Sequence, residues 1–259
     1  SLEFNDQYPL LYLNMARLNI DQPLTTAQDS LVKFNVNIAN AYKAGAGLKY
    51  VEEFLHGEVV KNSIKEFYTE NVLQQSSSAE FREILEKNAS KDISWFFDDY
   101  VASSDKIDFK IKHVKKTGDS LEVTIKNNNM PVPLYGLNNG QIVYKTWVEN
   151  TRGEQTVTIS REGIERLALN HEAIIPELNR RDNYKGITTF LNKPVQFRLL
   201  QDIEDPRYYQ VFFMPEVSYN LYDGIAVGPK VYNKPFLNRT FDFRISPKFG
   251  FNSKTIVGS

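Results

Sequence analysis

The first hundred residues follow the 3.6-residue period of an α-helix. In TTAQDSLVKFNVNIANAY, apolar residues recur at spacings of three and four: Leu31, Phe34, Ile38 and Tyr42. Thr25 or Thr26 can cap the first turn, because a side-chain oxygen there accepts a backbone N–H. The pattern predicts a helix over residues 26–42 with one apolar stripe turned toward a core.

Three more helices are predicted before residue 101. The first carries a helical-period apolar set: Val60, Ile64, Phe67 and Val72. The second follows the loop QQSSS, where Ser77 and Glu80 have the spacing of a capping box. The last has Ser90 as its predicted cap and carries a bulky apolar cluster: Ile93, Trp95, Phe96 and Phe97. We therefore expect an α-helical domain over residues 1–101.

From about residue 105 the period changes from 3.6 to 2, which is typical of strands. In IDFKIKHV, polar residues alternate with Ile107, Phe109, Ile111 and His113. SLEVTIKN alternates in the same way, and KTGDS between the two runs predicts a hairpin turn. Further strands are predicted in QIVYKTWV and EQTVTIS, joined by ENTRG. Short antiparallel strands at this spacing predict a β-sandwich over residues 102–186.

The last segment, residues 187–259, is also predicted to be β but is richer in aromatic residues. Strands are expected in VQFRLL, YYQVFFM, TFDFRIS and KTIVG, and connections in NLYDG and GPKVYNKP. About 70 residues of this kind offer no closed core of their own. The fold class expected for the whole chain is α+β and multidomain: a helical bundle, an antiparallel β-sandwich and a further antiparallel β segment.

Composition narrows the function classes. Apolar residues make up 41% of the 259 residues, enough for a sizeable core. Lys and Arg (31) nearly balance Asp and Glu (32), so no basic field is available for nucleic acid. The chain has no cysteine, which excludes disulfides and thiolate chemistry. It starts without Met and without a signal-peptide pattern, and we expect it to be a piece of a longer protein.

Motifs for metal or phosphate chemistry are missing from the sequence. The three histidines are far apart, and His171-Glu172 is not followed by the second His of an HExxH motif. On the alternating strand, His113 is expected to be a half-buried packing residue, and His56 before Gly57 a helix C-terminal residue. The small residues 44–47 are expected to let two helices approach closely rather than to bind phosphate.

Residues 41–57, AYKAGAGLKYVEEFLHG, combine a Tyr, a Lys and small residues with a helical run that ends in Gly. Ala79-Glu80-Phe81 and the run DISWFF (residues 92–97) follow, and then the sandwich motifs LEVTI (121–125), MPVP (130–133) and the segment from Asn170 to Asn183. In order and spacing, these motifs resemble the region C-terminal to the zinc site in the aminopeptidase N family of gluzincin metallopeptidases. The resemblance covers about 160 of the 259 residues.

The resemblance implies that the intact protein is similar to zinc-dependent aminopeptidases, which hydrolyse peptide substrates. Their HExxH motif and later Glu would lie upstream of residue 1. We therefore expect no zinc ligand, no cofactor and no activity in this chain alone. The competing function class is a noncatalytic scaffold, a pseudoenzyme or interaction module, that binds a peptide or protein partner, for example along an exposed sheet edge.

The resemblance gives Tyr42 a role as the phenol that donates a hydrogen bond to the oxyanion of the reaction. However, an ungapped alignment on Lys43 and Leu48 places Ala41 where the family has its Tyr. One residue on a helix is about 100° of rotation. Either a one-residue shift brings Tyr42 to the catalytic position, or this donor is absent and Tyr42 completes the apolar stripe.

The tail resembles the opening strands of a bacterial outer-membrane β-barrel. The resemblance lies in VSYNLYDG (217–224), in FLNRTF (236–241) and in the alternation of Phe241, Phe243 and Ile245 with polar residues. It implies a place in the cell envelope, periplasm or outer membrane, of a two-membraned bacterium, with outer-membrane association through this segment. A soluble sheet needs the same alternation, so both interpretations stay open.

Overall fold

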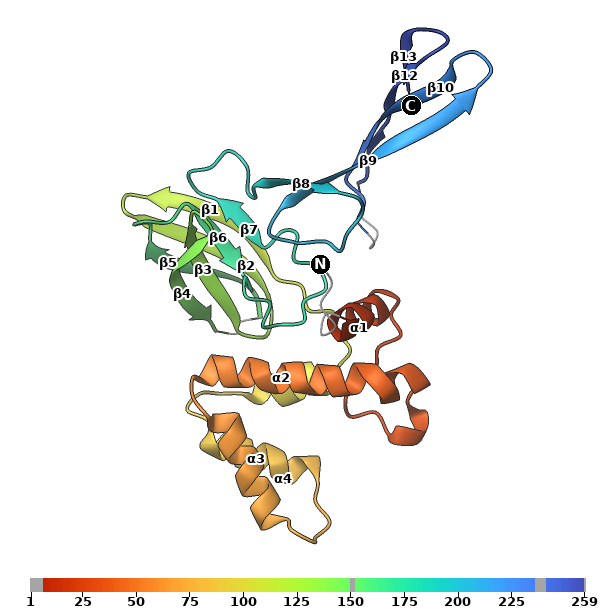
Figure 1. Ribbon diagram of the computed structural model, residues 1–259. Coiled ribbons are helices and arrows are strands. Elements are labelled where there is room, and N and C mark those ends of the chain that lie inside the picture. Colours follow the sequence, from red (N-terminus) through yellow and green to blue (C-terminus); the bar gives the residue numbers. More distant parts are fainter. Residues whose placement is uncertain (1–6, 150–151, 236–240, 259) are drawn as a thin grey trace. The chain divides into compact units, whose positions relative to one another are not determined.

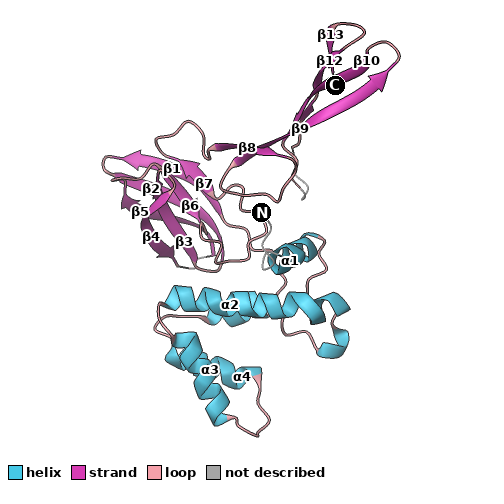
Figure 2. Cartoon of the chain, viewed as in Figure 1, coloured by secondary structure: helices cyan, strands magenta, loops and turns pink. Residues whose placement is uncertain are grey.

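The structure is a computed structural model that describes residues 7–149, 152–235 and 241–258. The chain divides into two compact units, Ser1–Phe190 and Leu191–Ser259. Helices occupy the first part of the first unit, and strands form the rest of both units (Figure 2). This arrangement confirms the α+β multidomain class expected from the sequence.

The helical part contains α1 (Gln7–Arg17), α2 (Asn40–Leu55), α3 (Val59–Glu70) and α4 (Ser78–Asn88). Two π-helical stretches, η3 (Asn35–Ala39) and η4 (Phe96–Val101), and one short 3-10 turn complete it. Helices α3 and α4 pack side by side as a hairpin beyond the end of α2 (Figure 1). In the described residues, no helix has both the length and the apolar character needed to cross a membrane.

The helix expected over residues 26–42 begins later and turns a different face inward. Residues 28–30 form a 3-10 turn, and the continuous helix starts near residue 33, passes through η3 and runs on as α2. Asn35 is buried and donates hydrogen bonds to the Ile20 carbonyl (3.1 Å) and to Gln22 Oε1 (2.6 Å). A π-helical turn holds more residues than an α-helical one, so the inward face is not the predicted stripe. It runs through the buried residues Asn35, Ala39, Lys43 and Gly47.

Among the small residues of α2, Gly47 is the point where the helix crosses η4 closely. A Cβ atom added at Gly47 would collide with the Tyr100 ring and lie 2.9 Å from Phe96 Cε2, both on η4. The Tyr100 hydroxyl donates to the Lys43 carbonyl at 2.8 Å, which holds the two segments together. Gly45 faces open space, so only one of the two glycines serves the crossing.

The caps of the later helices agree with the sequence in one case and differ in the other. Ser77 and Glu80 form the complete capping box of α4, since each side chain accepts a hydrogen bond from the other residue's backbone N–H. Ser90 does not cap the last helical segment. Asp92 has that role instead, because its carboxylate accepts the Ser94 backbone N–H at 2.9 Å.

The β-sandwich packs two sheets. One has the order β1-β2-β5 and the other β4-β3-β6-β7. Their bounds are β1 (Lys110–Thr117), β2 (Ser120–Asn128), β3 (Val132–Asn138), β4 (Gln141–Val148), β5 (Arg152–Ser160), β6 (Arg166–Leu169) and β7 (Tyr184–Gly186). The predicted hairpin joins β1 to β2, and its Gly118 has a φ of +57°. Strands β4 and β5 belong to different sheets, and the ENTRG connection between them includes residues 150–151, outside the described residues.

A β-bulge changes the expected side of His113. The pairing of β1 with β2 shifts register between Ile111 and His113, so one extra residue enters β1. Val114 therefore packs against the core and His113 is exposed to solvent. The expectation that His113 is a half-buried packing residue was wrong.

Helices and sandwich share one hydrophobic core. On α2, the Tyr50 ring lies 4.6 Å from Trp95 and 6.0 Å from Trp147 of β4, and Phe54 lies 5.3 Å from Trp147. The Tyr50 hydroxyl also donates to the carbonyl of Pro131, just before β3. Helix α2 is thus fixed on one side by η4 and on the other by the sandwich.

The second unit is a single sheet of order β13-β12-β10-β9-β8, with β11 paired to β10. The bounds are β8 (Val195–Leu199), β9 (Tyr209–Asn220), β10 (Gly224–Tyr232), β11 (Arg244–Ile245), β12 (Pro247–Gly250) and β13 (Thr255–Gly258). All pairs are antiparallel except β8 with β9, which is parallel. Alternation along a strand does not reveal its direction, so this parallel pair could not be predicted from the sequence.

Strand β10 includes Gly228–Tyr232, which we expected to be a loop because it contains Gly228 and Pro229. It pairs with β9 over its whole length. Proline cannot donate to a ladder. Pro229 is tolerated because the pairing of β10 with β12 covers Ala226 and Val227, that with β11 covers Val231 and Tyr232, and Pro229 lies between them.

Candidate functional site

Tyr42 lies near the N-terminal end of α2, half-buried against α1. Its ring centroid is 5.4 Å from that of Tyr12, which is itself almost fully buried. Burial raises the pKa of the Tyr42 phenol, and the positive charge of Arg180 opposes this rise. The hydroxyl is therefore protonated at neutral pH and is able to donate a hydrogen bond.

Two other buried tyrosines, Tyr50 and Tyr100, use their hydroxyls to hold the fold. Tyr50 donates to the Pro131 carbonyl, and Tyr100 donates to the Lys43 carbonyl at 2.8 Å. Within the part of the chain that the structure describes, the hydroxyl of Tyr42 has no hydrogen-bond partner. Tyr42 thus differs from both in having a donor available to a ligand.

The helix gives three consecutive residues three different environments. Ala41 is exposed, Tyr42 is half-buried and Lys43 is buried. Leu31, the first residue of the predicted apolar stripe, lies before the helix begins. Tyr42 therefore does not complete the stripe that the sequence predicted. The catalytic role of Tyr42 stays a prediction.

Lys43 is a buried ionisable group that sequence reasoning missed. Its ammonium is buried, donates to the Ser103 carbonyl at 2.7 Å and lies 5.7 Å from the centroid of the Tyr100 ring. Burial lowers the pKa of Lys43 to about 8, although the Asp21 carboxylate acts in the opposite direction. The signal was present in the sequence, because Lys43 stands four residues from each of two small residues, Ala39 and Gly47.

Glu177 is a second buried ionisable group, in the segment between Asn170 and Asn183. Its carboxylate accepts the Phe109 backbone N–H at 2.8 Å and the side-chain amides of Asn183 (2.6 Å) and Asn170 (3.2 Å). Burial raises the pKa of Glu177 to about 8, while these three donors favour the charged form. Its place in the apolar run AIIPEL was the only sign in the sequence.

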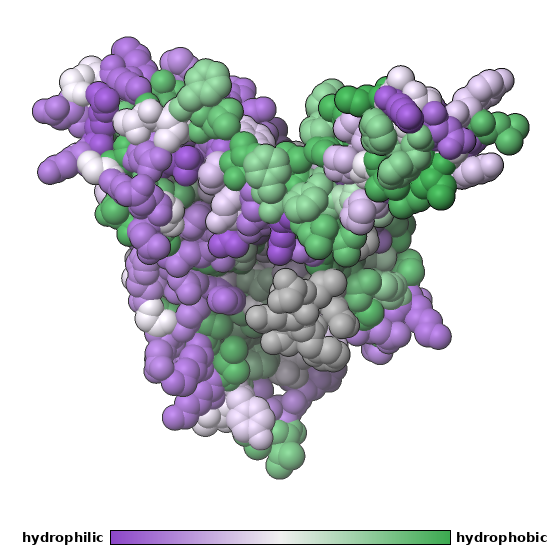
Figure 3. Space-filling model, turned by 45° about the horizontal axis from the view of Figure 1, so that its top comes forward, coloured by the Kyte–Doolittle hydropathy of each residue, from purple (hydrophilic) through white to green (hydrophobic). Residues whose placement is uncertain are grey.

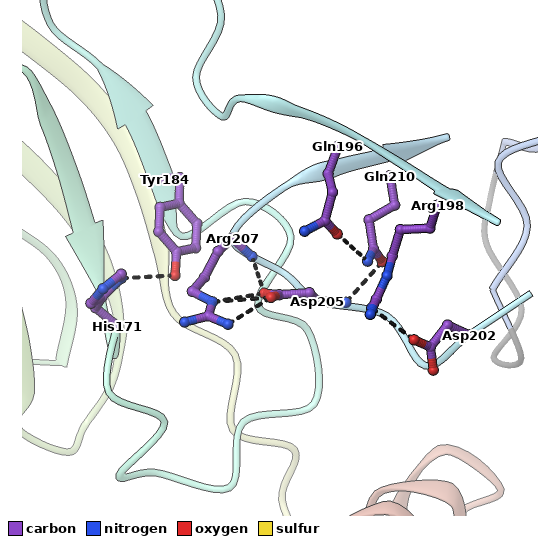
Figure 4. Close-up of polar contacts among 8 residues, drawn as sticks. All are labelled: His171, Tyr184, Gln196, Arg198, Asp202, Asp205, Arg207 and Gln210. Atoms are coloured by element: carbon purple, nitrogen blue, oxygen red, sulfur yellow. Dashed lines mark hydrogen bonds and ion pairs between the residues drawn. The ribbon is translucent and has the colours of Figure 1, made fainter. Parts of the chain in front are cut away.

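Three acidic side chains of the helical part and His171 have structural partners. Asp98 pairs with Arg82 at 2.6 Å, Asp99 accepts from Asn129 at 2.8 Å, and Glu52 accepts the Val60 N–H at the start of α3. His171 lies within hydrogen-bond distance of the Tyr184 hydroxyl, 3.1 Å away (Figure 4). His56 ends α2 with a φ of +55°, as its position before Gly57 led us to expect.

No set of residues in the described part of the chain fits a zinc ion. No three His, Asp or Glu side chains there converge on one point, whereas a protein zinc site needs at least three such ligands.

Comparison with known proteins gave partial likenesses in fold. No protein-family model and no curated protein sequence matches the chain. Among solved structures, it is similar to a crystal structure of Legionella pneumophila aminopeptidase A in complex with aspartic acid, with 14% identity and a TM-score of 0.47. The match covers 66% of this chain but only 23% of that protein. A likeness of this size concerns the arrangement of elements alone.

Proposed function

We propose that this chain forms one wall of the peptide cleft in an aminopeptidase-like hydrolase, and that Tyr42 donates a hydrogen bond to the oxyanion of the reaction. Support comes from the order of the motifs at residues 41–57, 79–81 and 92–97, which resembles the aminopeptidase N family. The observation that carries the role of Tyr42 is its available hydroxyl, beside Tyr50 and Tyr100, whose hydroxyls bind backbone carbonyls.

Peptide hydrolysis requires a neutral hydrogen-bond donor in a fixed position beside the carbonyl oxygen. When a nucleophile attacks a peptide carbonyl, negative charge develops on the oxygen, and a preorganised donor lowers the barrier. Burial raises the pKa of the Tyr42 phenol, which keeps the proton that it must donate. The crossing of α2 with η4 at Gly47 and the Tyr50 hydrogen bond to Pro131 hold the helix that carries it.

The test is Tyr42→Phe in the full-length protein that contains this chain, assayed with aminoacyl 4-nitroanilides. Loss of one oxyanion donor lowers kcat by about 10²–10³-fold, and we expect KM to change little. The matched control is Tyr68→Phe on α3, because Tyr68 is 72% exposed. A Tyr42→Phe protein with the kcat of the wild type would remove Tyr42 from the reaction.

The same protein preparation distinguishes a hydrolase from a noncatalytic scaffold. If the wild-type protein binds peptides in calorimetry but does not turn them over, with its metal content restored, the chain belongs to a binding protein. Turnover that depends on Tyr42 supports the hydrolase.

A further inference from the structure

The sheet of the second unit has one face without charge. The register places two apolar rows across it, Leu199–Phe213–Val231–Ile245 and Val217–Val227–Phe249–Ile256. Tyr219 with Ile225 and Pro215 with Pro229 continue the same face along β9 and β10. The described residues of 191–259 form this one sheet and its connections, and the side chains of the second row are 41–80% exposed.

The opposite face carries the charged and small side chains of the same strands. Lys248 pairs with Glu216 at 3.5 Å and donates to Ser218 at 3.2 Å, and Gln210 donates to Gln196 at 2.9 Å (Figure 4). Lys230, also on this face, contributes to a hollow of about 520 Å³ that Arg244 lines as well. The charged side chains thus lie on one face of the sheet, and the other face is suited to contact with an apolar environment.

The dimensions of the longest strand fit a lipid bilayer. Strand β9 has 12 residues, which at about 3.4 Å per residue span about 40 Å. A tilt of about 45°, typical of strands in membranes, reduces this to about 28 Å, close to the hydrocarbon thickness of about 25–30 Å. The length is about twice the usual strand of about 5–6 residues in soluble proteins.

Aromatic residues gather where β9 and β12 end. Tyr219 and Tyr222 are exposed at the turn between β9 and β10. Phe251 is exposed at the neighbouring turn, where its N–H donates to the Ile225 carbonyl at 3.0 Å. Tyr and other aromatic rings favour the boundary between headgroups and hydrocarbon. Figure 3 shows hydrophobic residues at the surface of the lobe built from these strands.

We propose that the uncharged face of β8, β9, β10, β12 and β13 contacts the hydrocarbon of a lipid bilayer. Pro215 and Pro229 would lie at mid-depth, Tyr219 and Tyr222 toward one interface, and Val217 and Val227 between these levels. A second copy of the chain is a poorer occupant, because a protein interface of this extent usually carries hydrogen-bonding groups at its rim. The inference does not depend on peptidase activity.

The test is flotation of the full 259-residue chain with phosphatidylcholine–phosphatidylethanolamine vesicles. We expect the wild type to float and Val217→Asp to bind the vesicles about tenfold more weakly, since a charge on a lipid-facing strand position is costly. The matched control is the adjacent Ser218→Asp, which faces the other side and lies beside Lys248. It should float like the wild type.

Three results would overturn the proposal. One is a wild type that stays in the aqueous fraction. Another is a Val217→Asp protein that floats equally well while circular dichroism shows the same strand content. The third is a dimer in lipid-free buffer that Val217→Asp dissociates, because the face would then be covered by a second copy.

Discussion

Gly47 allows a sharp test of how α2 is held in place. In Gly47→Ala, the new Cβ would overlap the Tyr100 ring and come within 2.9 Å of Phe96 Cε2. Tyr100 is 2% exposed, and its hydroxyl is bonded to the Lys43 carbonyl. The ring therefore has little room to move, and any movement puts at risk a hydrogen bond that contributes about 1 kcal/mol.

Two opposing terms set the magnitude. Alanine is the better helix former by about 1 kcal/mol, but overpacking of a core costs about 1–3 kcal/mol. With loss of the hydrogen bond added, we expect Gly47→Ala to lower the free energy of unfolding by about 1–3 kcal/mol. Gly45→Ala gains about 0.5–1 kcal/mol, because nothing lies near its added Cβ.

Thermal and urea unfolding of the two single variants measure this difference directly. We expect midpoints in opposite directions from the wild type, by a few degrees in each case. If Gly47→Ala is as stable as Gly45→Ala, the crossing at Gly47 is not tight and the positioning of α2 must be explained otherwise.

Three further variants test other parts of the first unit. Burial raises the pKa of Glu177 from 4.5 to about 8, so its stabilising contribution is complete below pH 4.5 and is lost as the pH rises through 8. The unfolding free energy of the wild type minus that of Glu177→Gln should therefore fall over this window, by at most about 5 kcal/mol, and a constant difference would contradict the assignment. The pKa of Lys43 is lowered from 10.5 to about 8. The unfolding free energy of the wild type minus that of Lys43→Met should therefore rise between pH 8 and 10.5, by up to about 3 kcal/mol. A difference that does not change with pH would show an unperturbed ammonium. Ser77→Ala should lose about 1 kcal/mol by removing the cap of α4, and the neighbouring Ser76→Ala should lose none in the same urea titration.

Local patterns predicted what depends on local physics. The Ser77–Glu80 capping box needs only two residues three apart, and the β1–β2 hairpin needs only a turn between two alternating runs. Both could therefore be predicted from the sequence. The missing core of the last segment was readable too. In the described residues of the second unit, only Phe212, Ala226, Tyr232 and Pro235 are buried apolar side chains.

Features set by distant contacts were not readable. The π-helical stretch that turns Lys43 inward accompanies the hydrogen bonds of Asn35 to Ile20 and Gln22, residues on a preceding loop. The bulge that exposes His113 arises from the register of β1 on β2. The burial of Glu177 depends on Phe109, which is 68 residues away. Sequence periodicity carries none of this information.

The most direct measurement concerns Tyr42 itself. A phosphinic peptide, whose tetrahedral phosphorus mimics the intermediate of peptide hydrolysis, can be bound to the full-length protein and the complex solved at high resolution. We predict that the Tyr42 hydroxyl lies about 2.7–3.1 Å from a phosphinate oxygen, the range for an oxyanion donor. A Tyr42 ring that stays against Tyr12 while another group contacts that oxygen would contradict the proposed role.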